Sequence, residues 1–131
     1  MIGILIISHS HIGKELLKAT ELILGQIEAA ETISIIQIIE TETILKEITE
    51  KIKQLDNGQG VIILTDMFGG TPSNLSLSFL QEGHVEVLTG VNLPMVVAIA
   101  QERNRLSLNE LGEKAKQAGL RSIALAGNML K

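Results

Sequence analysis

The residues of this chain best suited to chemistry are a histidine and a distant aspartate. His9 ends a short apolar run that begins at Ile2, and Asp66 directly follows a second apolar run, Gly60–Thr65. A neutral imidazole is nucleophilic near neutral pH, and a carboxylate on one ring nitrogen leaves the other nitrogen ready to attack. A single histidine at a strand end is more often held by local backbone, so this interpretation depends on pairing with Asp66.

A glycine loop follows Asp66 and could receive an anion. The segment Gly69-Gly70-Thr71-Pro72 predicts a helix start, with the Thr71 hydroxyl as N-cap and Pro72 at the first helical position. Backbone N–H groups in such a loop favour phosphate. No Lys follows the glycines, and no Gly-x-Gly-x-x-Gly is present, which argues against a nucleotide-binding loop. The loop is better suited to holding a phosphoryl group briefly.

The other polar residues near these runs have simpler interpretations. His11 is expected at the rim of the site, because two histidines without a third clustered ligand are a weak zinc signal. His84 is expected on the surface. A hydrolase triad built from Ser8 or Ser10 is disfavoured, since the chain has no Gly-x-Ser-x-Gly elbow. We therefore expect neither a metal nor a cofactor.

Hydrophobic patterning predicts alternating strands and helices within a single domain over residues 1–131. The expected strands are Ile2–Ser8, Ile33–Ile38, Gly60–Thr65, His84–Leu88 and a last strand Ile123–Leu125. The expected helices are Ile12–Leu24, Thr43–Leu55, one from Thr71, Pro94–Gln101, and one that starts at a Ser107–Glu110 capping box and ends at Gly119. This pattern is typical of an α/β fold, with an open, mostly parallel sheet and helices on both faces. A strand order of about 2-1-3-4 would bring His9 and Asp66 to the same crevice.

Composition excludes several classes of function. The chain has no Cys, so it can form neither a disulfide nor a thiolate site. Two Phe, no Trp or Tyr, and a net charge of −4 argue against nucleic-acid binding. No segment approaches the roughly 20 apolar residues of a membrane span, and the N-terminal run lacks the features of a signal peptide. We expect a soluble cytoplasmic protein without direct membrane insertion.

Three motifs together resemble the mannose-family enzyme IIA of the bacterial sugar phosphotransferase system. They are Ile-Ser-His ending at His9, Thr-Asp-Met-Phe-Gly-Gly-Thr-Pro-Ser-Asn from Thr65, and Gly-Val-Asn-Leu-Pro-Met from Gly90. They occur in the family's order and spacing, and the likeness covers essentially the whole chain.

The resemblance implies a phosphohistidine carrier in sugar uptake, a phosphotransferase that needs no cofactor. By this likeness His9 is phosphorylated by the histidine-containing phosphocarrier protein, and Asp66 orients its ring. The resemblance does not identify the modified ring nitrogen, and we expect Nε2, with Nδ1 facing Asp66. Gly69, Gly70, Thr71 and Ser10 are expected beside the phosphoryl group. The acceptor is expected to be an enzyme IIB on a separate chain. The family also implies a homodimer in which the last strand joins the partner's sheet.

Ser10 departs from the glycine that often follows the active histidine in this family. Ser-His-Ser is similar to the phosphotransferase subunit of dihydroxyacetone kinase, which is not expected to carry the second and third motifs. Two alternatives therefore stay open beside sugar uptake. One is a regulatory phospho-acceptor of an incomplete phosphotransferase system, and the other is that kinase subunit.

Overall fold

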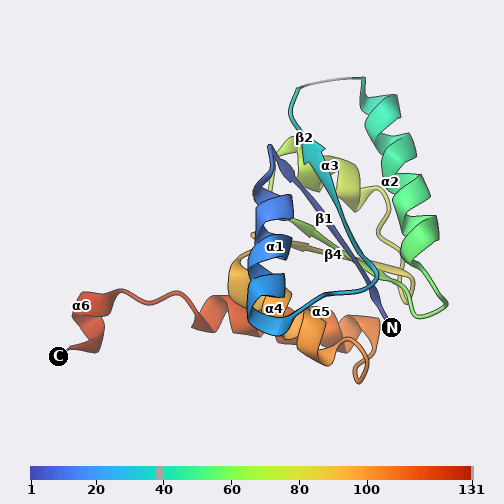
Figure 1. The fold of residues 1–131 in the computed structure, drawn as a ribbon. Coiled ribbons are helices and arrows are strands. Elements are labelled where there is room, and N and C mark those ends of the chain that lie inside the picture. Colours follow the sequence, from blue (N-terminus) through green and yellow to red (C-terminus); the bar gives the residue numbers. More distant parts are fainter. Residues whose placement is uncertain (38–39, 131) are drawn as a thin grey trace.

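The computed structural model describes residues 1–37 and 40–130. Along the chain the elements are β1 (Gly3–His9), α1 (Ile12–Leu24), β2 (Ala30–Ile35), α2 (Thr41–Leu55), β3 (Val61–Thr65), α3 (Thr71–Leu77), β4 (Val85–Thr89), α4 (Leu93–Glu102), α5 (Leu108–Arg121) and α6 (Ala126–Met129). Strands and helices alternate as far as α4, and the helices surround the sheet (Figure 1). No helix among the described residues is both long and apolar enough to cross a bilayer.

The sheet has four parallel strands in the order β2-β1-β3-β4, which confirms the predicted fold class and order. The side chains of β3 are all buried, and in β1 only the terminal His9 is exposed. These two strands are central, so both of their faces are covered and their sequences are uniformly apolar. Their carboxyl ends carry His9 and lead into Asp66, which fixes the position of the site.

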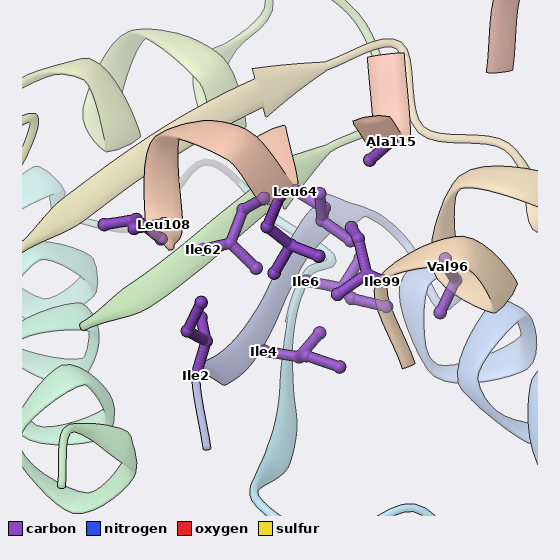
Figure 2. Packing of buried hydrophobic residues seen from close by; sticks show 10 residues of the cluster. Ile2, Ile4, Ile6, Ile62, Leu64, Val96, Ile99, Leu108 and Ala115 are labelled. Carbon is purple, nitrogen blue, oxygen red and sulfur yellow. The ribbon is translucent and has the colours of Figure 1, made fainter. Parts of the chain in front are cut away.

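Each face of the sheet packs on its own set of helices. One cluster joins alternate residues of β1 and β3, such as Ile4 and Ile62, to Val96 and Ile99 of α4 and to α5 (Figure 2). On the opposite face, the remaining strand residues pack against α2, with α3 at its margin. The alternation follows from the two-residue side-chain period of a strand.

Helix α1 makes its closest approach to the sheet through small residues, and Leu17 is partly buried against the core. Gly13 and Thr20 are its buried residues, whereas Ile12, Ile23 and Leu24 are exposed. A Cβ at Gly13 would lie 2.7 Å from Cγ2 of Ile6. A side chain at this position would therefore hold the helix away from β1.

Several predicted boundaries differ from the structure by one or two residues, and two of the wrong boundaries have a clear structural reason. The second strand begins and ends earlier than Ile33–Ile38, because β2 is an edge strand whose half-buried positions accept Glu31 and Thr32 outside the apolar run; Ile38 itself lies outside the described residues. In α3 the N-cap is Gly70 and Thr71 is already helical, with no side-chain cap.

The predicted last strand is not formed within this chain. Helix α5 continues past Gly119 to Arg121, and Ile123–Leu125 then leads out to α6 without pairing to the sheet. This segment extends away from the rest of the molecule (Figure 1). Its apolar residues Ile123 and Leu125 are 75% and 71% exposed. A strand needs a neighbouring edge to hydrogen-bond with, and the extended path carries the segment away from its own sheet.

A buried arginine closes the end of the sheet opposite His9. Arg103 follows α4 and is only 5% exposed. Its guanidinium donates hydrogen bonds to the carbonyl oxygens of Ile2, Glu28 and Ala29, which precede β1 and β2. Burial lowers the pKa of Arg103, and the charge of Glu28 partly opposes that shift. The side chain ties α4 to the starts of two strands.

We expect Arg103→Met to lower the free energy of unfolding by about 3 kcal/mol, because buried carbonyls lose their donor. Urea denaturation measures this change. Arg105→Met is the matched control: Arg105 is exposed and forms a surface ion pair with Glu102, so its loss should cost less than about 0.5 kcal/mol. Equal midpoints for the two variants would contradict the role of Arg103.

Candidate functional site

His9 and Asp66 meet at the carboxyl ends of two adjacent central strands. His9 is the last residue of β1, and Asp66 directly follows β3. The register pairs Ile7 with Thr65, so the two chain segments leave the sheet side by side. The fold thus brings together two residues that are 57 positions apart.

One oxygen of Asp66 binds both the backbone and the ring of His9. Oδ2 accepts the backbone N–H of His9 at 2.9 Å and lies 2.8 Å from Nδ1. An ionised carboxylate can only accept, so this contact favours the tautomer with the proton on Nδ1. Among the described residues, Nε2 has no hydrogen-bond partner, and the His9 side chain is 46% exposed. The geometry therefore presents an unprotonated ring nitrogen to solvent.

The contacts with His9 also keep Asp66 ionised. Partial burial acts to raise the pKa of Asp66. Hydrogen bonds from the backbone N–H and the ring of His9, together with the charge attraction between the two side chains, lower this pKa by more. The Met67 N–H adds a hydrogen bond to Oδ1. The pKa of Asp66 accordingly lies below its ordinary value of 3.8.

Ser8 holds the tight turn between His9 and α1. Its buried hydroxyl accepts the N–H of Gly13 at 2.9 Å and donates to the carbonyl of Ser10 at 3.3 Å. Ser10 has a φ of 50°, a left-handed conformation that favours glycine. Ser10 is exposed beside His9, and its N–H donates to the carbonyl of Ile35.

The glycine loop lies against the Cε1–Nε2 edge of the His9 ring. A Cβ at Gly70 would be 2.8 Å from Cε1 and 3.5 Å from Nε2 of His9, so the backbone approaches here because no side chain intervenes. Gly69 has a φ of 87° and allows the turn. Among the described residues, the N–H groups of Gly69, Gly70 and Thr71 have no hydrogen-bond acceptor. These amides belong to the loop that approaches the ring edge carrying Nε2.

The two other histidines are separate from this site. Nδ1 of His11 lies 3.1 Å from the hydroxyl of Ser34 on β2, which places His11 at the rim. His84 is exposed at the start of β4, at the other end of the sheet. In the described part of the chain, no group of three or more His, Asp or Glu side chains gathers as metal ligands would.

Sequence reasoning missed two features of the site. Met67 and Phe68 follow Asp66 and are 55% and 75% exposed, so they form an apolar surface beside His9. Ser73 is fully buried beneath the same loop and donates to the carbonyl of Met67. Two apolar residues after a strand are a visible signal of the first feature. Nothing in the sequence distinguishes Ser73 from the other serines of that segment.

We expect Asp66 to contribute stability that disappears in acid. Because its folded pKa is lowered, the contribution is present above the unfolded value of about 3.8 and is lost as the pH falls through the lower folded pKa. Asp66→Asn removes the titrating group. The difference in unfolding free energy between wild type and variant, from urea denaturation at several pH values, should shrink as the pH falls below about 4. A difference that stays constant over that range would contradict the assignment.

The sequence and fold can now be compared with those of known proteins. The family model EIIA-man, described as the PTS system fructose IIA component, matches residues 3–116. The PTS system mannose-specific EIIAB component of Escherichia coli strain K12 is 32% identical over 124 residues, which are 93% of this chain. This chain spans only 38% of that relative's length.

Two further comparisons cover most of both chains. The PTS system sorbose-specific EIIA component of Lacticaseibacillus casei is 30% identical over 112 residues, covering 82% of this chain and 78% of the relative. The crystal structure of phosphotransferase system component EIIA from Streptococcus agalactiae superposes with a TM-score of 0.88 over 98% of this chain and 99% of that one, at 24% identity, a likeness of fold. The resemblance carried by the three motifs is thereby confirmed, and the chain belongs to the EIIA-man family of phosphotransferase-system IIA components.

Proposed function

We propose that this chain carries a phosphoryl group on Nε2 of His9. It would take the group from the histidine-containing phosphocarrier protein and pass it to an enzyme IIB on a separate chain, in the cytoplasm, during sugar uptake. The observation that carries this proposal is the 2.8 Å contact between Nδ1 and Asp66, which leaves Nε2 facing solvent. Relatives named for mannose and for sorbose share the family, so their names do not select one sugar for this chain.

The proposed step is an in-line exchange between two imidazoles. The lone pair on Nε2 of His9 attacks phosphorus, the Nε2–P bond forms, and the N–P bond of the donor phosphohistidine breaks. The bonding electrons leave with the donor ring. The proton on Nδ1 stays between the ring and Asp66, whose negative charge stabilises the phosphorylated imidazolium. The reverse sequence at an acceptor returns His9 to its starting state.

The loop amides would stabilise the phosphoryl oxygens. The N–H groups of Gly69, Gly70 and Thr71, together with the Ser10 hydroxyl, are the donors that we propose for this role. The close approach of Gly70 to Cε1 and Nε2 supports this arrangement. Fixed amide dipoles need no reorganisation as charge moves onto the oxygens.

The surface around His9 suits exchange between proteins. The side chains of Met67 and Phe68 are exposed beside it, and Ile12 at the start of α1 is 47% exposed. A donor and an acceptor must each bring a reactive group up to His9 in turn. Exposed apolar residues at the rim would give both partners a surface to bury.

We expect His9→Ala to abolish labelling when the chain is incubated with radiolabelled phosphocarrier protein. Asp66→Asn should fold but accept the label roughly 100-fold more slowly, because the ring loses its fixed tautomer and orientation. His84→Ala is the matched control, since His84 is an exposed histidine at the other end of the sheet. Label retained by His9→Ala, or lost from His84→Ala, would refute the assignment of the carrier residue.

We also propose that the chain forms a homodimer through its C-terminal segment. A groove of about 260 Å³ runs beside the edge strand β4, and Leu88, Met95 and Leu120 are among the residues that line it. The exposed segment Ile123–Leu125 follows α5 directly and could pair with β4 of a second copy. Such pairing would cover apolar side chains and satisfy an open sheet edge.

We expect the chain to sediment as a dimer in analytical ultracentrifugation and the double variant Ile123→Asp with Leu125→Asp to sediment as a monomer. Charged side chains on the pairing segment would have to be buried in the groove, which is costly. Leu22→Asp is the control, because Leu22 is exposed on α1, which packs beside β1 and β2, away from the β4 edge. A double variant that stays dimeric would contradict this interface.

A further inference from the structure

Two fully buried hydroxyl groups lie beneath the loop that carries Asp66. Thr65 ends β3 and Ser73 lies in the first turn of α3, and both are 0% exposed. Their hydroxyl oxygens are 2.6 Å apart. The Ser73 hydroxyl donates to the carbonyl of Met67, so the Thr65 hydroxyl must donate to Ser73. The pair forms a chain of hydrogen bonds from the strand through the helix to the loop.

A second buried serine on the same helix shows what is particular about Ser73. Ser76 is also 0% exposed, but its hydroxyl donates to the carbonyl of Pro72 within α3. The Ser76 hydroxyl is therefore hydrogen-bonded within its own helix. Burying a hydroxyl costs free energy unless it is bonded, and the bonds of Ser73 are made to residues outside the helix.

The loop has few other constraints. Met67, Phe68 and Gly69 are exposed, so packed side chains do not define the path of the chain. Met67 instead is held on both sides: its N–H donates to Oδ1 of Asp66, and its carbonyl accepts from Ser73. The position of the Asp66 carboxylate is thereby linked to the buried serine.

We propose that Ser73, supported by Thr65, is a positioning residue for the phosphoryl transfer at His9. It fixes the Met67 carbonyl, and through it the distance and angle at which Asp66 and the amides of Gly69 and Gly70 meet the imidazole. This inference rests on the proposed function for its effect on transfer. Its effect on the His9 ring stands on the geometry alone.

The test compares Ser73→Ala with Ser76→Ala by two measurements. Ser73→Ala should slow labelling by the phosphocarrier protein roughly 10- to 100-fold, because a small displacement of a reacting group lowers the transfer rate strongly. Ser76→Ala should stay within about twofold of wild type, since the Ser76 hydroxyl is bonded to Pro72 within α3 and not to the loop that carries Asp66. ¹⁵N NMR of the unphosphorylated chain should give a lower fraction of the Nδ1–H tautomer of His9 in Ser73→Ala and no change in Ser76→Ala.

A second pair of variants covers the case in which Ser73→Ala does not fold. Thr65→Val keeps the shape but removes the hydroxyl, and Thr65→Ser keeps the hydroxyl. The first should reduce both the transfer rate and the tautomer fraction, and the second should restore them.

The possible failures can be told apart. If wild type takes no label from the donor, the proposed function is refuted, while the NMR comparison, which needs no donor, still decides whether Ser73 positions the ring. If wild type is labelled but Ser73→Ala matches Ser76→Ala in rate and in tautomer fraction, the positioning role is overturned.

Discussion

The site depends on one carboxylate oxygen that receives two hydrogen bonds from the same residue. Oδ2 of Asp66 accepts the backbone N–H of His9 at 2.9 Å and the ring Nδ1 at 2.8 Å. The backbone bond fixes the oxygen relative to the end of β1, and the ring then has a defined place to direct Nδ1. The orientation of the imidazole therefore depends on the position of the strand ends in the sheet as well as on the side chain itself.

That arrangement requires a scaffold that keeps two strand ends in register. The side chains of β3, and all those of β1 but His9, are buried between two layers of helices, and at the opposite end Arg103 ties α4 to the starts of β1 and β2. Packing over both faces leaves the strands little freedom to slide. His9 ends β1 and Asp66 directly follows β3, and the chain that continues from each residue is held by polar contacts from Ser8 and Ser73.

The proposed carrier role explains why the site is open rather than enclosed. His9 is 46% exposed, with apolar side chains of Met67 and Phe68 beside it. A small-molecule enzyme would gain from excluding water around its substrate. A carrier that must meet two proteins in turn needs a ring whose orientation is fixed through Nδ1 and whose other nitrogen is accessible to both partners.

Much of this fold could be predicted from the residues. The uniformly apolar runs before His9 and Asp66 identify central parallel strands, because only strands buried on both faces lack polar alternation. The bounds of an edge strand are harder to predict. Strand β2 begins at Ala30 and includes Glu31, because an edge strand tolerates polar residues and is therefore not marked by a continuous apolar run. The close contact between α1 and β1 is also not visible in the pattern, because it is made at Gly13 and not at a large apolar residue.

The order of residue types along the chain therefore predicts which side chains form the site, the class of chemistry they suit, and the strand order that could bring them together. The folded arrangement is needed to show that Nδ1 and not Nε2 binds Asp66, that Gly70 lies against the ring, and that Ser73 is anchored to Met67. It also decided that Ile123–Leu125 leaves its own sheet unpaired. The physical reason is that patterns along a chain record burial and propensity, whereas the direction of a hydrogen bond or the partner of a strand depends on groups that are distant in sequence and meet only after folding.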